Sequence, residues 1–189
     1  MKLLVASILF VAGPVFAGWE EDFQELKKRP ASYENTGSIC EEIGRLQVER
    51  ELNDSNFEVI TGVEYGTAGR TLGELDIVVF DKRSGDAVHA SEVKCWKDMR
   101  GGLKKARQQR ARFVNAVNSG KNLYFRAVLS KETYPSKIFQ NVREFTTLGQ
   151  KGTKKSGYDS ELEYDLRELH NMRGEMLDCQ SREECPRPY

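Results

Sequence analysis

Three closely spaced β-strand patterns constrain this fold more than any other feature of the sequence. Residues 75–80 are rich in Ile and Val, and a second apolar segment, residues 87–95, follows them after the turn residues 83–86. A further strand pattern, residues 57–63, precedes them across the glycine-containing segment 66–70. Strands joined by such short turns pair antiparallel, so we expect a three-stranded meander.

Three charged residues lie within the segments 75–80 and 87–95. Asp76 stands in the sequence GELDI, and Glu92 and Lys94 stand two apart in SEVK, so the side chains of Glu92 and Lys94 share one face of their strand. Burying such charges unpaired is unfavourable, whereas two carboxylates bind a hard divalent cation. The pattern therefore predicts a Mg²⁺ (or Mn²⁺) site for phosphodiester hydrolysis, with Lys94 orienting or deprotonating the attacking water.

The other expected elements complete an α/β pattern. Apolar residues at helical spacing predict several helices, and one more strand is expected after the helix that follows the meander. We expect helices at residues 19–28, 39–53, 102–119, 136–146 and 160–176 and a strand at residues 123–129. Because a crossover helix precedes this fourth strand, a parallel pairing is allowed, and the sheet is expected to be mixed with helices on both faces.

GELD followed by SEVK resembles the PD-(D/E)xK nuclease superfamily, which has the restriction-endonuclease-like fold. The resemblance covers residues 37–129, where the expected element order matches the αβββαβ core of that family. It is especially similar to the small predicted-endonuclease branch with the motifs GxxxE, GE(I/L)D and ExK. The resemblance implies that Asp76, Glu92 and the Val93 carbonyl bind metal and that Lys94 is the catalytic lysine. It also implies a mixed central sheet flanked by helices, to which extra C-terminal helices are added.

Two further catalytic positions follow from the same resemblance. Gly37 to Glu41 fits GxxxE, and Glu41 is favoured over the neighbouring Glu42 because it shares a helix face with Gly44, Val48 and Leu52. Gln109 fits the first position of a QxxxY element in which Phe113 replaces the tyrosine. Gln109 is equally well explained as a residue on the flank of its helix.

Basic residues gather beside the predicted site. Residues 94–112 hold eight basic residues and one acid, Asp98, a sum of +7. Such a patch binds phosphates without sequence preference, although it is also compatible with a solvated helix face. Trp96 either stacks on a base or sugar or belongs to the core. The partner expected is a nucleic acid, with DNA favoured, contacted by Lys97, Arg100, Lys104, Lys105, Arg107, Arg110 and Arg112.

The N-terminus has the features of a secretory signal peptide. Lys2 precedes a short apolar run at residues 3–11, and Ala17 ends a small-residue cleavage pattern. We expect cleavage after Ala17 and an exported protein, periplasmic or secreted, that is not bound to a membrane after cleavage. A membrane anchor or a buried N-terminal strand is the alternative.

Four cysteines in an exported chain suggest disulfide bonds. Cys179 and Cys185 lie close together in a polar segment, so a local bridge is the simplest expectation, and it leaves Cys40 and Cys95 as the second pair. Four cysteines allow three pairings, and sequence does not choose among them. A zinc site is the rival, but the chain has no CxxC motif and its two histidines lack ligand spacing.

These observations divide the chain into a signal peptide (residues 1–17), an N-terminal helix and linker (18–36), a nuclease core (37–150) and a C-terminal helical extension (151–189). Residues 159–184 carry nine acids and three arginines, a sum of −6. They form either a docked helix with an acidic outer face or a cover over the basic patch.

The expected function is an exported Mg²⁺-dependent nuclease that acts on DNA. One alternative is a catalytically inactive exported module of the same fold that binds nucleic acid or protein. Another is a disulfide-stabilised secreted structural protein. The sequence leaves the oligomeric state open.

Overall fold

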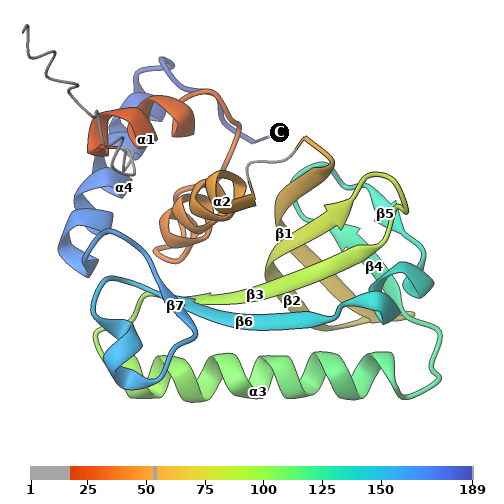
Figure 1. The fold of residues 1–189 in the computed structure, drawn as a ribbon. Helices are drawn as coiled ribbons and strands as arrows, with labels where there is room; N and C mark the ends of the chain where they lie inside the picture. The colour runs from red at the N-terminus through yellow and green to blue at the C-terminus, as the bar shows by residue number, and fades with distance from the viewer. Residues whose placement is uncertain (1–17, 53–54, 189) are drawn as a thin grey trace, which may run out of the picture.

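The computed structural model describes residues 18–52 and 55–188, so the expected signal peptide lies outside the described residues. These residues form an α/β fold with one mixed sheet of seven strands in the order β5-β4-β1-β2-β3-β6-β7 (Figure 1). Helices cover both of its faces, as expected. No helix in the described part of the chain has the length and apolar character needed to cross a bilayer.

The predicted antiparallel meander is confirmed, with its first two strands longer than expected and its third ending one residue earlier. β1 (Phe57–Thr67) pairs with β2 (Arg70–Asp81), and β2 pairs with β3 (Ala87–Lys94), both antiparallel. Gly69 adopts a left-handed conformation (φ 78°) in the turn between β1 and β2, a conformation that glycine adopts without strain. The meander therefore forms the centre of the sheet.

The parallel pairing occurs at a different strand from the one expected. After α3 (Met99–Val117), β4 (Tyr124–Ala127) pairs antiparallel with β1, and β5 (Thr133–Tyr134) extends that edge. The parallel neighbour of β3 is β6 (Glu144–Gly149), which in turn pairs parallel with β7 (Ser160–Glu161). The sheet is mixed because of β6 and β7, and the expectation of a parallel fourth strand was wrong.

The expectation of a helix at residues 136–146 was also wrong. A short 3₁₀ helix, Ser136–Asn141, leads directly into strand β6. Phe145 and Leu148 of β6 are buried in two different core clusters, one on each side of the sheet. A strand that lies between β3 and β7 satisfies its main-chain groups on both edges, and this pairing overrides the local helical pattern.

The C-terminal helix begins later than expected, because its N-cap is Asp165. The Asp165 carboxylate accepts from the main-chain N–H groups of Arg167 and Glu168, and the Glu168 side chain accepts in return from the Asp165 N–H. This capping box fixes the start of α4 (Leu166–Ser181). The preceding residues include β7 and a second 3₁₀ helix, Thr153–Ser156.

The helices form two layers on opposite faces of the sheet (Figure 1). α1 (Trp19–Leu26), α2 (Ser38–Leu52) and α4 pack together on one face, and α3 lies along the other. The acidic C-terminal segment thus docks as α4 against α1 and α2, and the alternative in which it covers the basic helix α3 was wrong.

Candidate active site

Asp76, Glu92 and Lys94 meet at the place where β2 and β3 separate. The paired ladder between these strands ends at Ile77 opposite Ser91. Beyond this point the main-chain N–H of Val93 donates to Asp76 Oδ2 at 2.7 Å. The Asp76 carboxylate thus accepts the hydrogen bond that a main-chain carbonyl of β2 would otherwise accept from Val93. Because the two strands are no longer paired here, there is room for charged side chains between them.

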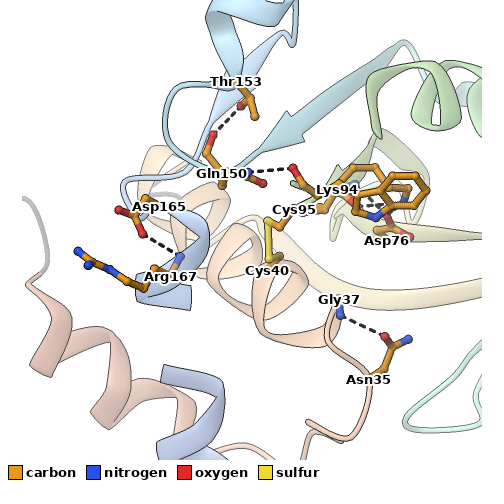
Figure 2. Close-up of a disulfide and its surroundings, with 12 residues drawn as sticks. Asn35, Gly37, Cys40, Asp76, Lys94, Cys95, Gln150, Thr153, Asp165 and Arg167 are labelled. Carbon is orange, nitrogen blue, oxygen red and sulfur yellow. Dashed lines mark hydrogen bonds and ion pairs between the residues drawn. A yellow bond between two sulfur atoms is a disulfide. The ribbon is translucent and has the colours of Figure 1, made fainter. Parts of the chain in front are cut away.

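The Lys94 ammonium group is surrounded by three oxygen acceptors. Lys94 Nζ lies 2.6 Å from Asp76 Oδ2, 3.2 Å from Glu92 Oε2 and 2.9 Å from the Val93 carbonyl oxygen. The side chains are almost enclosed, with Glu92 fully buried and Lys94 11% exposed. Figure 2 shows Lys94 and Asp76 side by side at this position. The structure brings together the three charged residues that the sequence singled out.

α3 packs closely against the stem of Lys94. A Cβ atom at Gly102 would lie 3.4 Å from Lys94 Cβ and 2.6 Å from the Tyr158 hydroxyl, so a larger residue at position 102 would push the helix away. On its other side, Lys94 is paired with Gly149 of β6. These contacts confine the lysine stem and direct its amine toward the carboxylates.

The site contains a buried acid that keeps its proton at neutral pH. The pKa of Glu92 is raised to about 9, first by burial and then by the charge of Asp76, whereas Lys94 lowers it. Glu92 Oε1 is buried and has no hydrogen-bond partner among the described residues. Burial alone would lower the pKa of Lys94, but the charges and hydrogen bonds of Asp76 and Glu92 leave it raised, so the amine is a cation at neutral pH.

The structure separates the two candidate acids of α2. Glu42 is buried and already bonded, accepting from Arg45 Nε at 2.9 Å and from Thr61 Oγ1 at 2.6 Å. Burial raises the pKa of Glu41 to about 8, followed by the charges of Asp76 and Glu74. The Glu41 carboxylate therefore lies within electrostatic reach of the site, as the sequence motif favoured.

Glu74 is a member of the acidic group that the sequence reasoning left out. Burial raises its pKa, followed by the charges of Asp76 and Glu64. It lines a cavity of about 400 Å³ together with Glu41 and Glu42. Its place in the GELD motif, two residues before Asp76 on the same strand face, was the signal for it.

Gln109 is not bonded to this group of charges. Its side chain is half-buried on α3, and its Oε1 atom is buried without a hydrogen-bond partner in the described part of the chain. No hydrogen bond joins it to Asp76, Glu92 or Lys94 within those residues. Its predicted catalytic role stays a prediction.

The predicted nucleic-acid contacts are exposed and lie on or just before α3. Two of them also bond to the protein: Arg107 Nη2 donates to the Gly157 carbonyl at 3.4 Å and Arg112 Nη1 to the Leu72 carbonyl at 3.2 Å. Arg110 lies over the ring of Phe145. The exposed basic residues are Lys97, Arg100, Lys104, Lys105, Arg107, Arg110 and Arg112.

Trp96 lies on the surface instead of in the core. Its side chain is 45% exposed although it follows Lys94 by only two residues. Its carbonyl accepts from Gln150 Nε2 at 3.1 Å, which fixes the main chain at this point. The alternative in which Trp96 belongs to the core was therefore wrong, and its stacking on a base or sugar stays a prediction.

Both predicted disulfide bonds are present. Cys179 is bonded to Cys185, and Cys40 is bonded to Cys95. Figure 2 shows the second bridge between α2 and the end of β3, next to Lys94. Two disulfide bonds are compatible with an exported protein.

The residues present fit a hard divalent cation. No group of three or more His, Cys, Asp or Glu side chains among the described residues is arranged to hold a metal ion. Mg²⁺, however, keeps several waters and needs only one or two carboxylates from the protein. Two carboxylates and the Val93 carbonyl already surround one cation, the Lys94 ammonium, and this all-oxygen set suits Mg²⁺ or Mn²⁺.

Comparison of the chain with protein-family models, with curated proteins and with solved structures found no match. A function is therefore inferred from the GELD and SEVK motifs and from the geometry of this site.

Proposed function

We propose that this protein is an exported, Mg²⁺-dependent nuclease of the PD-(D/E)xK type that hydrolyses phosphodiester bonds of DNA. The observation that supports it best is the convergence of Asp76, Glu92 and the Val93 carbonyl on one buried cation at the point where β2 and β3 separate. Two motifs from neighbouring strands of the predicted meander supply all of these groups.

In this proposal each group has a defined role. Asp76, Glu92 and the Val93 carbonyl hold the metal ion, which when bound neutralises charge on the phosphoryl oxygens and acidifies a water. Lys94 then donates its N–H groups to the attacking water or to a phosphoryl oxygen, where its positive charge offsets the developing negative charge. The exposed lysines of α3 hold the flanking phosphates.

The number of buried acids supports metal binding over a purely structural ion pair. Besides the Asp76–Lys94 ion pair, the site has two further acids, Glu92 and Glu41, whose pKa values are raised to about 9 and about 8. Both acids therefore hold a proton at neutral pH in the metal-free protein, and a structural ion pair alone would not need them. A divalent cation can replace these protons.

The test is cleavage of supercoiled plasmid by the oxidised chain from Gly18 onward, with Mg²⁺, with Mn²⁺ and with a chelator. We expect chelator-sensitive nicking that Asp76→Asn and Lys94→Met abolish. The matched controls Asp178→Asn and Lys121→Met change exposed residues of the same types and are expected to cleave like the wild type. Retarded plasmid without cleavage would instead favour the inactive binding module. RNA assayed in parallel defines the substrate.

Export is part of the proposal and has a separate test. The sequence features of residues 1–17 and the two disulfide bonds support it. Expression of the full chain in a bacterium is expected to give a periplasmic or secreted product whose mass corresponds to a start at Gly18. A cytoplasmic product that retains Met1 would contradict export and leave the nuclease proposal unaffected.

A further inference from the structure

The Cys40–Cys95 disulfide joins the two chain segments that carry Glu41 and Lys94. Cys40 directly precedes Glu41 in α2, and Cys95 directly follows Lys94, the last residue of β3. The bridge spans 55 residues of sequence and lies next to the site (Figure 2), with Cys40 buried and Cys95 partly buried. One covalent link thus fixes the separation between an acid on one helix and the amine on a strand.

The body of α2 does not depend on this bridge for its place in the fold. A Cβ atom at Gly44 would lie 2.9 Å from Ile77 Cδ1 and 2.9 Å from Leu148 Cδ2, so the helix lies directly on the sheet there. Ile43 is fully packed in the same core cluster. Packing of this kind holds a helix through its apolar face, whatever the state of one crosslink at its first turn.

The Glu41 carboxylate, by contrast, is partly buried but is not fixed by any hydrogen bond or ion pair within the described residues. No hydrogen bond or ion pair joins its oxygens to another residue there, whereas Glu42 is bonded to both Arg45 and Thr61. Its position therefore follows the main chain of the first turn of α2, which the disulfide ties down at the adjoining residue Cys40.

The chain on the other side of the bridge has also left the sheet. β3 ends at Lys94, and neither Cys95 nor Trp96 belongs to a strand ladder. The bond from Gln150 to the Trp96 carbonyl, the disulfide and the packing of Cys95 against the core hold this segment. Because Cys95 directly follows Lys94, a shift of the main chain at Cys95 also moves Lys94.

We propose that the Cys40–Cys95 disulfide is a positioning clamp that holds Glu41 against the site formed by Asp76, Glu92 and Lys94, and that the nuclease reaches its full kcat only when the clamp is closed. The inference rests on the proposed function. Cys40 and Cys95 act through their neighbours and are positioning residues. A chain kept in a thiol-rich compartment would then fold around a less active site, and export would raise its activity.

Closure of the clamp is a thiol–disulfide exchange. The two thiols of Cys40 and Cys95 give up two protons and two electrons to a disulfide donor, such as oxidised glutathione or a disulfide-bearing oxidoreductase. One sulfur–sulfur bond forms in the protein while the donor bond breaks, and the donor leaves as two thiols. Reduction by a dithiol runs the same exchange in reverse.

The test compares two pairs of substitutions in the same chain. Cys40→Ala with Cys95→Ala opens the clamp, and Cys179→Ala with Cys185→Ala removes a bridge that lies within the C-terminal segment. We expect the clamp variant to keep its circular dichroism spectrum and its KM for DNA while kcat falls about tenfold, the same loss as for Glu41→Gln, because a misplaced catalytic group contributes little. We expect the control variant to lose thermal stability and to keep kcat.

A double-mutant cycle separates positioning from general destabilisation. Glu41→Gln is expected to lower kcat about tenfold with the clamp closed and less than about twofold with it open, because a misplaced carboxylate no longer contributes. Independent, multiplicative losses would overturn the positioning role, since a purely structural crosslink gives that result.

A second route is used where the clamp variant does not fold. The Cys179→Ala, Cys185→Ala protein is first purified oxidised, then treated with dithiothreitol and finally with oxidised glutathione. Reversible loss and recovery of nicking supports the clamp, and full activity of the folded, reduced protein overturns it. Absence of metal-dependent nicking by the oxidised wild type would instead overturn the proposed function itself, together with the clamp.

Discussion

The Asp76 carboxylate accepts a hydrogen bond from the main-chain N–H of Val93 at 2.7 Å, where a strand carbonyl would otherwise accept. This bond gives Asp76 a structural role that is separable from metal binding. An asparagine at position 76 keeps an oxygen acceptor for that N–H, whereas an alanine leaves it unsatisfied in a buried site.

We therefore predict that Asp76→Ala and Asp76→Asn both abolish cleavage but differ in stability. An unsatisfied buried N–H costs about 1–3 kcal/mol, and about 2–4 °C of Tm corresponds to each kcal/mol in a chain of this size. Thermal unfolding is expected to place Asp76→Ala several degrees below Asp76→Asn. Equal Tm values for the two variants would contradict the role assigned to the Val93 bond.

The raised pKa values of the buried acids predict how stability changes with pH in the metal-free protein. The folded pKa of Glu92 is about 9, against an ordinary value of 4.5, so the folded state binds this proton more tightly than the unfolded state. The stabilisation is complete below pH 4.5 and is lost as pH rises through 9. Glu41, with a pKa of about 8, contributes in the same direction.

Thermal unfolding with a chelator is accordingly expected to give a Tm that falls from pH 5 to pH 9. Glu92→Gln removes one titrating group and is expected to flatten the profile. Glu183→Gln, at an exposed position, serves as the control and is expected to leave the slope unchanged. A wild-type Tm that rises over this range would contradict the raised pKa values of Glu92 and Glu41.

Lys94 occupies the position around which the proposed metal ligands are arranged, so removing its charge has two opposite effects. Lys94→Met leaves Asp76 and Glu92 facing each other without a cation, and breaking a buried ion pair in this way costs about 3–5 kcal/mol. The same change frees the three oxygen acceptors for a divalent ion. The variant is therefore predicted to be less stable without metal, inactive with it, and a tighter binder of Mn²⁺ than the wild type.

Isothermal titration with Mn²⁺ and unfolding with and without the ion measure these effects. Lys97→Met changes an exposed lysine three residues away and is expected to leave both the affinity and the Tm close to wild type. Weaker Mn²⁺ binding by Lys94→Met would show that the ammonium and the metal do not share ligands.

The centre of the sheet was predictable because its signals are local. β2 and β3 are apolar runs separated by turn residues. The sequence contains no comparable local pattern that marks β6 as a strand. Residues 144–149, with the sequence EFTTLG, contain polar residues and no alternation, and the helix expected at residues 136–146 covered the first three of them. Thr147 shows why it is a strand: its N–H donates to Asp159 Oδ2 at 2.7 Å and its hydroxyl to the same atom at 2.8 Å, and its neighbours pair with β3.

The sequence likewise predicted those features of the candidate site that depend on local motifs, and missed those that depend on tertiary packing. The motifs placed Asp76, Glu92 and Lys94 on facing strands, and the even number of cysteines limited the disulfide pairings to three. That Lys94 takes the central position, and that Glu74 joins the acidic group, depends on where the ladder between β2 and β3 ends. The position at which the ladder ends depends on how α2 and α3 pack against the sheet. The residue pattern of a single strand does not predict this packing.

Trp96 is predicted to contribute to binding of single-stranded DNA by stacking. Its indole is 45% exposed beside the site, and base–aromatic stacking contributes about 1–3 kcal/mol per base. Trp96→Ala is therefore expected to weaken binding of a labelled oligonucleotide about 5- to 150-fold without lowering Tm. Val114→Ala removes another exposed apolar side chain, on α3, and is the control. Equal affinities of the two variants would rule out a stacking contact.

The lysines of α3 are predicted to act through charge, and salt dependence distinguishes charge from stacking. Each lysine that neutralises a phosphate of duplex DNA contributes about 0.9 to the slope of log affinity against log salt. Lys104→Gln with Lys105→Gln is expected to reduce that slope by about 2, whereas Trp96→Ala lowers affinity and leaves the slope unchanged. Lys27→Gln with Lys28→Gln, at the C-terminal end of α1 on the other face of the sheet, supplies the same change in net charge at a distant position (Figure 1). If this control reduces the slope as much as the α3 variant does, the binding follows net charge and α3 is not the DNA-binding surface.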